Sequence, residues 1–159
     1  VLSGSNALIL AAVASGLIEK EFSFLGFLPN KGDERKVAIQ NALNSPYPTI
    51  IYESPKRVLN LIKNIADIDP QREIFIIKEA TKKFETKYFD KAINLAQILE
   101  NENLNGEFCL VLDKSKNTKF ETILESDILD LDIPPKQKSK LLSKITGINQ
   151  KEIYKNLIK

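Results

Sequence analysis

Apolar residues along this chain fall into two kinds of pattern, which alternate from one end to the other. Short runs rich in β-branched and aromatic residues predict strands at residues 22–29, 49–53, 73–78 and 106–112, with a weaker one at 87–89. Longer stretches with helical spacing predict helices at residues 5–15, 33–44, 54–66 and 93–99. Strands that alternate with helices indicate an α/β fold, and the weak strand that follows 73–78 indicates a mixed sheet.

Capping residues mark the ends of two of these helices. Ser5 and Asn6 are good N-cap types for the first helix, and Gly16 is suited to end it. Ser54 followed by Pro55 predicts the start of the third helix. The faces expected to be apolar consist of Val37, Ala38, Ala42 and Leu43 in the second helix, and of Val58, Leu59, Ile62 and Ile65 in the third.

The last forty residues differ in composition from the rest. Residues 121–132 hold five acidic residues and no basic one, which predicts a weakly ordered linker. Two proline residues follow, and two short helical patterns at 136–146 and 150–158 flank a tight turn at 147–149, as in a helix-turn-helix. Their shared apolar seam is expected to consist of Leu141, Leu142, Ile145, Ile148, Ile153 and Leu157. We therefore expect a core at 1–120, a linker at 121–133 and a helix-turn-helix appendage at 134–159.

The net charge of +2 conceals an uneven distribution. Residues 134–159 carry seven lysines and one acidic residue, Glu152, whereas the preceding residues have a balance of −4. A basic end on an acidic body favours a polyanionic partner such as RNA. The alternative is a lysine-rich surface that only contacts solvent.

The composition excludes several kinds of chemistry. The chain contains no histidine, so a Ser-His-Asp triad cannot form within it, and a zinc site is not expected. Its single cysteine, Cys109, lies in an apolar run and is expected to be a buried small side chain. No apolar run reaches the length of a membrane span, so we expect a cytoplasmic protein. The chain lacks methionine and begins abruptly at Val1, from which we expect an N-terminal portion to be missing.

Three segments are candidates for a functional site. Residues 2–7 form a small turn before a helix N-terminus, where free backbone N–H groups could bind a carboxylate, a phosphate or an adenine. Residues 52–57 follow a strand, at the end where α/β sheets bind ligands. In this segment Glu53 is either a site residue or a helix-start carboxylate, and Lys56 and Arg57 face either RNA or solvent. Residues 78–86 follow a buried strand and are either a site or a loop of surface ion pairs.

The order of five motifs resembles a known family. SGSNALILAAVASGL, FSFLGFLPNKGDER, IIYESPKRV, IIKEATKKFET and GEFCLVL are similar to the C-terminal domain of tetrapyrrole-methylase-like (class III) methyltransferases. Within that fold they resemble the ribosomal RNA small-subunit methyltransferase I family, whose C-terminal appendage the lysine-rich end also resembles. YESPKR together with KEATKKFET is specific, whereas SGSNA alone is not. Ser3 stands where the family has proline.

The resemblance implies an S-adenosylmethionine-dependent enzyme that methylates the ribose 2′-hydroxyl of a cytidine in 16S ribosomal RNA. It also implies a missing N-terminal domain, a homodimer, and the small ribosomal subunit as partner. The cofactor-binding residues expected from this reading are Gly4, Asn6, Ala7, Tyr52, Gly106, Glu107 and Phe108. The residues expected on the substrate side are Glu79, Lys82 and Glu85, with no general base assigned among them. The residues expected to bind RNA are Lys56, Arg57, Lys138, Lys140, Lys151 and Lys155.

Two other functions stay open at this point. The same fold could methylate a porphyrin or corrin precursor, although a small acidic tetrapyrrole needs no lysine-rich appendage. A nucleic-acid-binding module without catalysis would explain that appendage, but not the polar segments at the strand ends.

Overall fold

The computed structural model describes residues 6–116 and 124–158, and the chain divides near residue 118 into two compact units. The first unit contains a five-stranded sheet in the order β1-β2-β5-β3-β4. Its strands are β1 (Ser23–Phe27), β2 (Thr49–Glu53), β3 (Glu73–Lys78), β4 (Thr86–Lys91) and β5 (Phe108–Leu112). β1 and β2 are parallel and the other neighbouring pairs are antiparallel, which confirms the predicted mixed α/β sheet.

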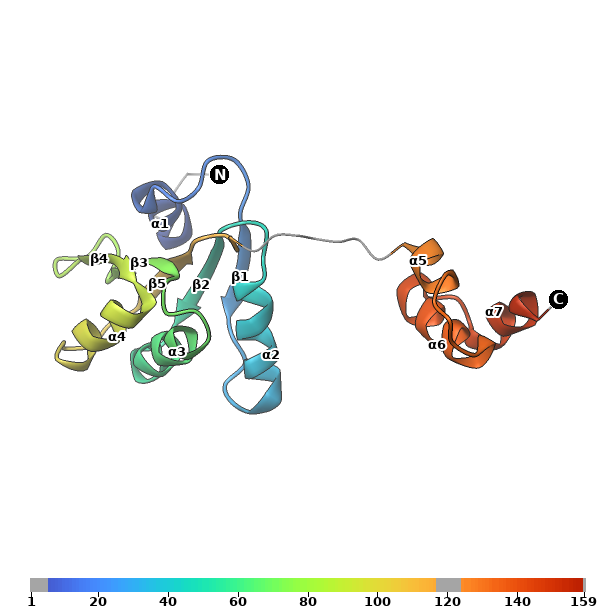
Figure 1. Cartoon of the computed structure of the whole chain (residues 1–159). Coiled ribbons are helices and arrows are strands. Elements are labelled where there is room, and N and C mark those ends of the chain that lie inside the picture. The colour runs from blue at the N-terminus through green and yellow to red at the C-terminus, as the bar shows by residue number, and fades with distance from the viewer. Residues whose placement is uncertain (1–5, 117–123, 159) are drawn as a thin grey trace. The chain divides into compact units, whose positions relative to one another are not determined.

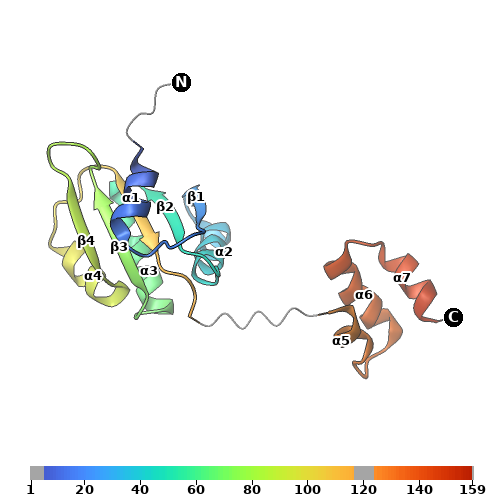
Figure 2. The same ribbon diagram turned by 90° about the horizontal axis from the view of Figure 1, so that it is seen from above.

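Helices cover the two faces of the sheet unequally (Figures 1 and 2). One face packs against α2 (Gly32–Leu43), α3 (Pro55–Ile68) and α4 (Ala92–Glu100), and it carries the larger core cluster. The other face packs against α1 (Ala7–Ser15) alone, through Ala11 and Ala12. Because side chains alternate along a strand, β3 supplies Ile74 and Ile76 to the first face and Phe75 and Ile77 to the second.

The predicted caps of α1 are confirmed. The Asn6 side chain accepts a hydrogen bond of 2.9 Å from the Leu8 backbone N–H, and Gly16 ends the helix in the left-handed region at φ 66°. Pro55 occupies the first turn of α3 as expected, but the Ser54 side chain does not cap that helix. Its hydroxyl instead accepts a hydrogen bond of 3.1 Å from Arg57.

The apolar face predicted for α2 is confirmed at Ala42 and Leu43, which are buried, and is wrong at Val37. Val37, expected in the core, is 57% exposed, whereas the charged Arg35 is buried. Ile39, Ala42 and Leu43 form the buried stripe beside it. Arg35 is buried because its partner Glu53 lies in β2, a pairing across 18 residues that helical spacing within α2 does not reveal.

The described residues of the second unit form three helices where two were expected: α5 (Glu125–Leu129), α6 (Pro135–Thr146) and α7 (Gln150–Leu157). α5 lies within the segment expected to be a weakly ordered linker, whose residues 121–123 fall outside the described part of the chain. The acidic composition favoured a linker, but Ile128 of α5 is buried and Lys138 of α6 donates a hydrogen bond of 2.6 Å to the Leu129 carbonyl.

The predicted seam between α6 and α7 is only partly correct. α6 contacts both α5 and α7, so its buried stripe is Ser139 and Leu142, three residues apart on one face. Leu141, Ile145 and Ile148 are exposed, although the sequence pattern placed them in the seam. The turn itself is as expected, because Gly147 ends α6 in the left-handed region at φ 72°.

Candidate functional site

A cavity of about 500 Å³ opens at one edge of the sheet. β1 and β2 are parallel, and β2 and β3 both run antiparallel to β5, so the carboxyl ends of β1, β2 and β3 meet at this edge. Open α/β sheets bind ligands at such an edge, and small-molecule sites have volumes of roughly 300–1,000 Å³. Position and size therefore make this cavity the candidate site of the first unit.

Four of the seven predicted cofactor residues line this cavity: Ala7, Tyr52, Glu107 and Phe108. Asn6 serves as the cap of α1 and does not line the cavity, and Gly4 lies outside the described residues. Gly106 lies beneath Glu79, because a Cβ atom at this position would be 2.6 Å from the Glu79 Cγ atom. Glycine at 106 therefore lets the chain before β5 pass close to the loop after β3.

Aromatic rings form one wall of the cavity. The Tyr52 ring contacts Phe24 edge-on at 5.1 Å and Phe27 at 5.8 Å between ring centroids. Both phenylalanines reach the same face of the sheet because the register of β1 shifts between Phe24 and Gly26, where Gly26 has φ 63°. Phe27 was not predicted as a site residue, and the bulge that turns it toward Tyr52 has no signal in hydrophobic spacing.

The single cysteine contributes an inert surface to the cavity. Cys109 is 2% exposed, as expected for a buried small side chain, and burial raises the pKa of its thiol to about 12. Burial is also the main reason that the pKa of the Tyr52 phenol lies above 10.0, with the neighbouring Cys109 adding to it. Both groups are neutral at physiological pH, so this wall offers a ligand apolar surface and one hydroxyl.

Glu53 is the buried centre of an ion-pair cluster at the end of β2. Its carboxylate is fully buried and accepts contacts of 2.9 Å from Arg35 and 2.7 Å from Arg57. The Ser54 backbone N–H donates a further hydrogen bond of 2.8 Å. Arg35 also donates to the Pro29 carbonyl, and Arg57 to the Asn30 side chain. Glu53 thus joins the loop after β1 to the start of α3, and Phe27, the last residue before this loop, lines the cavity.

The loop after β3 forms a second charged cluster beside the cavity. One Glu79 oxygen accepts hydrogen bonds of 2.8 Å from the Glu107 backbone N–H and 3.0 Å from Lys82. Lys82 also donates to the Glu107 carboxylate at 2.9 Å. The Glu107 N–H, followed by Lys82, holds the pKa of Glu79 below its usual value, and the two carboxylates raise the pKa of Lys82. Glu79 is therefore a weak proton acceptor here, and Lys82 a stable cation.

Glu85 closes the turn of the same loop. Its carboxylate accepts a hydrogen bond of 2.7 Å from the Thr81 N–H and pairs with Lys87 at 3.0 Å, and these contacts lower the pKa of Glu85. Glu79 and Thr81 adopt positive φ angles of 54° and 67°. Non-glycine residues rarely adopt this conformation, and it is concentrated at functional sites. The loop brings Glu79 and Lys82 together beside the cavity, while Glu85 lies one turn farther along.

The residues predicted to bind RNA differ in whether their side chains are already engaged in hydrogen bonds or ion pairs. Lys56 is exposed, whereas the guanidinium of Arg57 is engaged by Glu53, Ser54 and Asn30. In the second unit, Lys138 donates to α5, while Lys140 is exposed on α6. Lys151 and Lys155 both line a groove beside α7.

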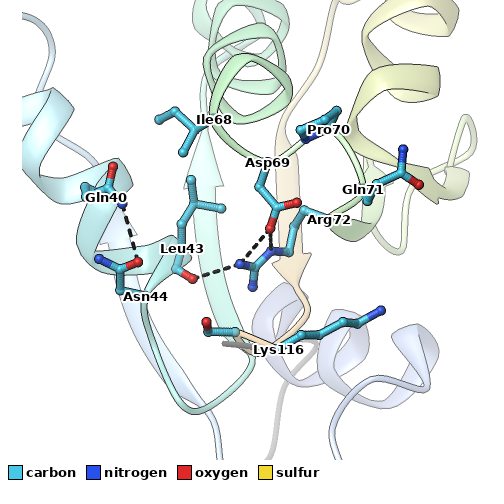
Figure 3. Close-up of a pocket in the computed structure, with 10 residues that line it drawn as sticks. Gln40, Leu43, Asn44, Ile68, Asp69, Pro70, Gln71, Arg72 and Lys116 are labelled. Carbon is cyan, nitrogen blue, oxygen red and sulfur yellow. Dashed lines mark hydrogen bonds and ion pairs between the residues drawn. The ribbon is translucent and has the colours of Figure 1, made fainter. Parts of the chain in front are cut away.

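A second concave region of about 360 Å³ lies elsewhere in the first unit (Figure 3). Its centre is Arg72, which donates hydrogen bonds to Asp69 at 2.9 Å, to the Leu43 carbonyl at 2.8 Å and to the Asp113 carbonyl at 2.7 Å. The hydrogen bonds of the buried guanidinium therefore join the ends of α2, α3 and β5. We assign this region a structural role, because its central charge is already paired.

Neither a metal site nor a membrane-spanning helix is present among the described residues. No cluster of three or more His, Cys, Asp or Glu side chains there could hold a metal ion. No helix in that part of the chain has the length and apolar character needed to cross a membrane.

Comparisons with known proteins agree with this geometry. No family model matches the chain. Over 99% of its length it is 68% identical to a protein of Campylobacter fetus named ribosomal RNA small subunit methyltransferase I, and it covers 58% of that protein. A protein of the same name from Helicobacter pylori is 37% identical over 97% of the chain, which covers 55% of it.

A solved structure shows the same fold at low sequence identity. It is a cobalt precorrin-4 methyltransferase of cobalamin biosynthesis, with a TM-score of 0.54 and 11% identity. The match covers 69% of this chain and 49% of that protein. The first unit therefore has the fold of tetrapyrrole methyltransferases, as predicted. The chain spans rather more than half the length of the curated relatives it matches, and both of the relatives described above are named ribosomal RNA small subunit methyltransferase I.

Proposed function

We propose that this chain is part of an S-adenosylmethionine-dependent enzyme that methylates the ribose 2′-hydroxyl of a cytidine in 16S ribosomal RNA. The observation that carries the proposal is the cavity where β1, β2 and β3 end, in a chain 68% identical to a protein named as a ribosomal RNA methyltransferase. The likeness to the precorrin methyltransferase supports the fold alone, so it does not favour a tetrapyrrole substrate.

The cavity fits a methyl donor of this kind. Its apolar and aromatic lining suits an adenosine, and its volume is that of a small-molecule site. Ala7, Tyr52 and Phe108 would contact the cofactor, with Glu107 at the rim. Bound there, S-adenosylmethionine supplies an activated methyl group on a positively charged sulfur, so the chain mainly has to bind and align the reactants.

The loop after β3 would act on the substrate hydroxyl through charge. Lys82 is held as an ammonium by Glu79 and Glu107, and a cation beside a ribose hydroxyl makes that hydroxyl easier to deprotonate. Glu79 would position Lys82 in this role, because its lowered pKa makes it a poor proton acceptor. Glu85 would act indirectly, because its hydrogen bond with the Thr81 N–H closes the turn that carries Lys82.

The partners of the whole protein form part of the same proposal. Lys56 and the lysine-rich second unit would bind the RNA of the small ribosomal subunit. An N-terminal domain and a second copy of the protein would cover the sheet face that α1 covers only partly. Exposed apolar side chains of α1 and β1 support such a contact: Ile9 and Val13 in α1, and Phe24 and Phe27 in β1. A cytoplasmic location follows from a ribosomal substrate.

Methyl transfer from labelled S-adenosylmethionine to unmodified small subunits tests the function, with the full-length gene product as enzyme. We expect a labelled nucleotide that resists alkaline cleavage, because a methylated 2′-oxygen cannot attack its phosphate. Changing Lys82 to alanine should lower kcat about 100-fold, the typical effect of removing one electrostatic contact to a developing charge.

Lys83→Ala is the matched control, because Lys83 lies in the same loop and its ammonium lies over the ring of Phe84, 5.5 Å from the ring centroid. Label on a base, or equal rates for Lys82→Ala and wild type, would contradict the assignment. Transfer to a tetrapyrrole precursor in place of RNA would favour the alternative substrate.

A further inference from the structure

The second unit contains a groove of about 660 Å³ beside α7. Four of its lining residues, Lys151, Tyr154, Lys155 and Ile158, are spaced three and four positions apart and so follow one side of the helix. Lys136, from the first turn of α6, lines the groove as well. The groove therefore combines three lysines, an aromatic ring and an aliphatic side chain in a unit of only three described helices.

The charges of this groove are unpaired. Within the described residues, Lys136, Lys151 and Lys155 form no ion pair, and no carboxylate is among the residues that line the groove. Lys138 belongs to a different surface, because its ammonium donates to the Leu129 carbonyl of α5. The acidic residues of the unit also lie mainly in and after α5, at Glu125, Asp127, Asp130 and Asp132. The groove thus has three positive charges and no negative one, whereas the described residues of the unit together hold six lysines and five acidic residues.

Side-chain hydrogen bonds hold the two walls of the groove in place. Gln150 donates from its side-chain amide to the Lys136 carbonyl and to the buried Ser139 hydroxyl, both at 3.4 Å. The Asn149 side chain accepts a hydrogen bond of 2.9 Å from the Lys151 N–H and so caps α7. The first turns of α6 and α7 are joined by these contacts, so the three lysines are carried on a defined framework.

This combination is typical of a surface for unpaired RNA. Proteins that bind single strands pair a positive groove for the backbone with aromatic rings on which bases stack. A double-stranded RNA suits the groove less well, because its major groove is too deep and narrow to admit a helix such as α7. Tyr154 is 38% exposed and Ile158 is 57% exposed, so both offer an open surface to a base.

We infer that the groove between α6 and α7 binds an unpaired RNA strand, with Lys136, Lys151 and Lys155 on its phosphates and one base stacked on Tyr154. The inference deepens the proposed function, on which it rests for the choice of RNA as the polyanion. It replaces the general expectation of a lysine-rich tail with a defined set of residues, which includes Lys136 and Tyr154 and leaves out Lys138 and Lys140.

The test is the binding of a fluorescein-labelled oligouridylate of about twelve nucleotides to the 159-residue chain, measured by anisotropy at several salt concentrations. Changing Lys151 and Lys155 together to glutamine should weaken binding at least about tenfold. It should also reduce the slope of log K against log salt by about 1.4, since each single-strand phosphate contact contributes about 0.7. The matched control changes Lys140 and Lys144 to glutamine, which removes the same charge outside the groove.

Tyr154 provides an independent arm of the test. Changing it to leucine should weaken oligouridylate binding about tenfold, because the apolar contact is kept while the stacking surface is lost. Changing it to phenylalanine should leave affinity near wild type. Equal losses for the two lysine pairs, wild-type affinity in Tyr154→Leu, or equally tight binding of an RNA duplex would each overturn the inference.

These measurements need no methyl donor. If RNA binding depends on the groove residues but the full-length protein transfers no methyl group, the proposed function is wrong and the RNA-binding role of the groove stands. Ribose methylation with unchanged RNA binding by the groove variants would reject the groove alone.

Discussion

Changing Glu53 to alanine is expected to lower the free energy of unfolding of the first unit by about 3–5 kcal/mol, the usual cost of removing one partner from a buried ion pair. Arg35 would keep only its hydrogen bond to the Pro29 carbonyl, while its side chain stays 7% exposed. Arg57 would lose its 2.7 Å contact but can turn toward water, since its side chain is 24% exposed. Most of the loss therefore comes from the uncompensated charge of Arg35.

Urea denaturation followed by far-ultraviolet circular dichroism measures this change. Glu53→Gln keeps the volume and one hydrogen-bond acceptor, so its loss should be smaller than that of the alanine variant. Lys36→Ala serves as the control, because it removes an exposed ion pair with Asp33 and should change stability by less than about 1 kcal/mol. A Glu53→Ala protein as stable as the Lys36→Ala protein would show that the cluster does not hold the loop after β1.

Changing Arg72 to alanine is expected to lower the free energy of unfolding by about 2–4 kcal/mol. The side chain donates to the carbonyls of Leu43 and Asp113, and each buried acceptor left without a donor costs about 1–3 kcal/mol. Figure 3 shows the Arg72 guanidinium with dashed lines to the Leu43 carbonyl and to the Asp69 carboxylate. Arg72→Lys should recover only part of the loss, because an ammonium lacks the planar fork that reaches several acceptors at once.

The control for Arg72 lies in the same concave region. Lys116 is 73% exposed and pairs with Glu73 at 3.4 Å, so its change to alanine should alter stability by no more than about 0.5 kcal/mol. Chemical denaturation of the three variants gives the comparison. If Arg72→Ala were as stable as Lys116→Ala, the ends of α2, α3 and β5 would be held by apolar packing without help from this side chain.

The regular elements of the first unit could be predicted because each is encoded locally. The apolar run of β3 gives its bounds, Glu73–Lys78, residue for residue, and the spacing of Val58, Ile62 and Ile65 identifies the buried face of α3. Arg35 could not be predicted in the same way. Its burial depends on the Glu53 carboxylate in β2. Hydrophobic periodicity reflects only the residues within one segment, so it cannot reveal an ion pair with a residue far away in the sequence.

The second unit shows a different limit of sequence patterns. Leu142 is buried as predicted, but Leu141 and Ile145 are exposed. α6 contacts both α5 and α7, and it buries Ser139 together with Leu142. Acidic residues suggested a linker at 121–133, where Ile128 is the buried side chain of the short helix α5. In a unit this small, one long-range contact changes which face of a helix is covered.

The candidate site was predicted in outline and not in detail. The position of Tyr52 at a strand end was enough to place it, because strand ends gather ligand sites in this class of fold. Phe27 and Ala80 were missed, since their places in the cavity depend on a bulge in β1 and on the positive φ angles around Ala80. The lysine-rich end suggested RNA, but only the packing of α6 against α7 separates Lys151 and Lys155 from Lys138.

The cavity at the carboxyl ends of β1, β2 and β3 is the site where we propose that the methyl donor binds. The most direct test of this proposal is calorimetric titration of S-adenosylmethionine into the full-length gene product carrying Ala80→Phe, which places a ring in the cavity, with Asn41→Phe on the exposed side of α2 as control. We predict that Ala80→Phe loses binding at least about tenfold, while Asn41→Phe binds as the wild type does and both variants keep the wild-type melting temperature within a few degrees. Unchanged affinity in a folded Ala80→Phe protein would contradict the account and place the methyl donor elsewhere.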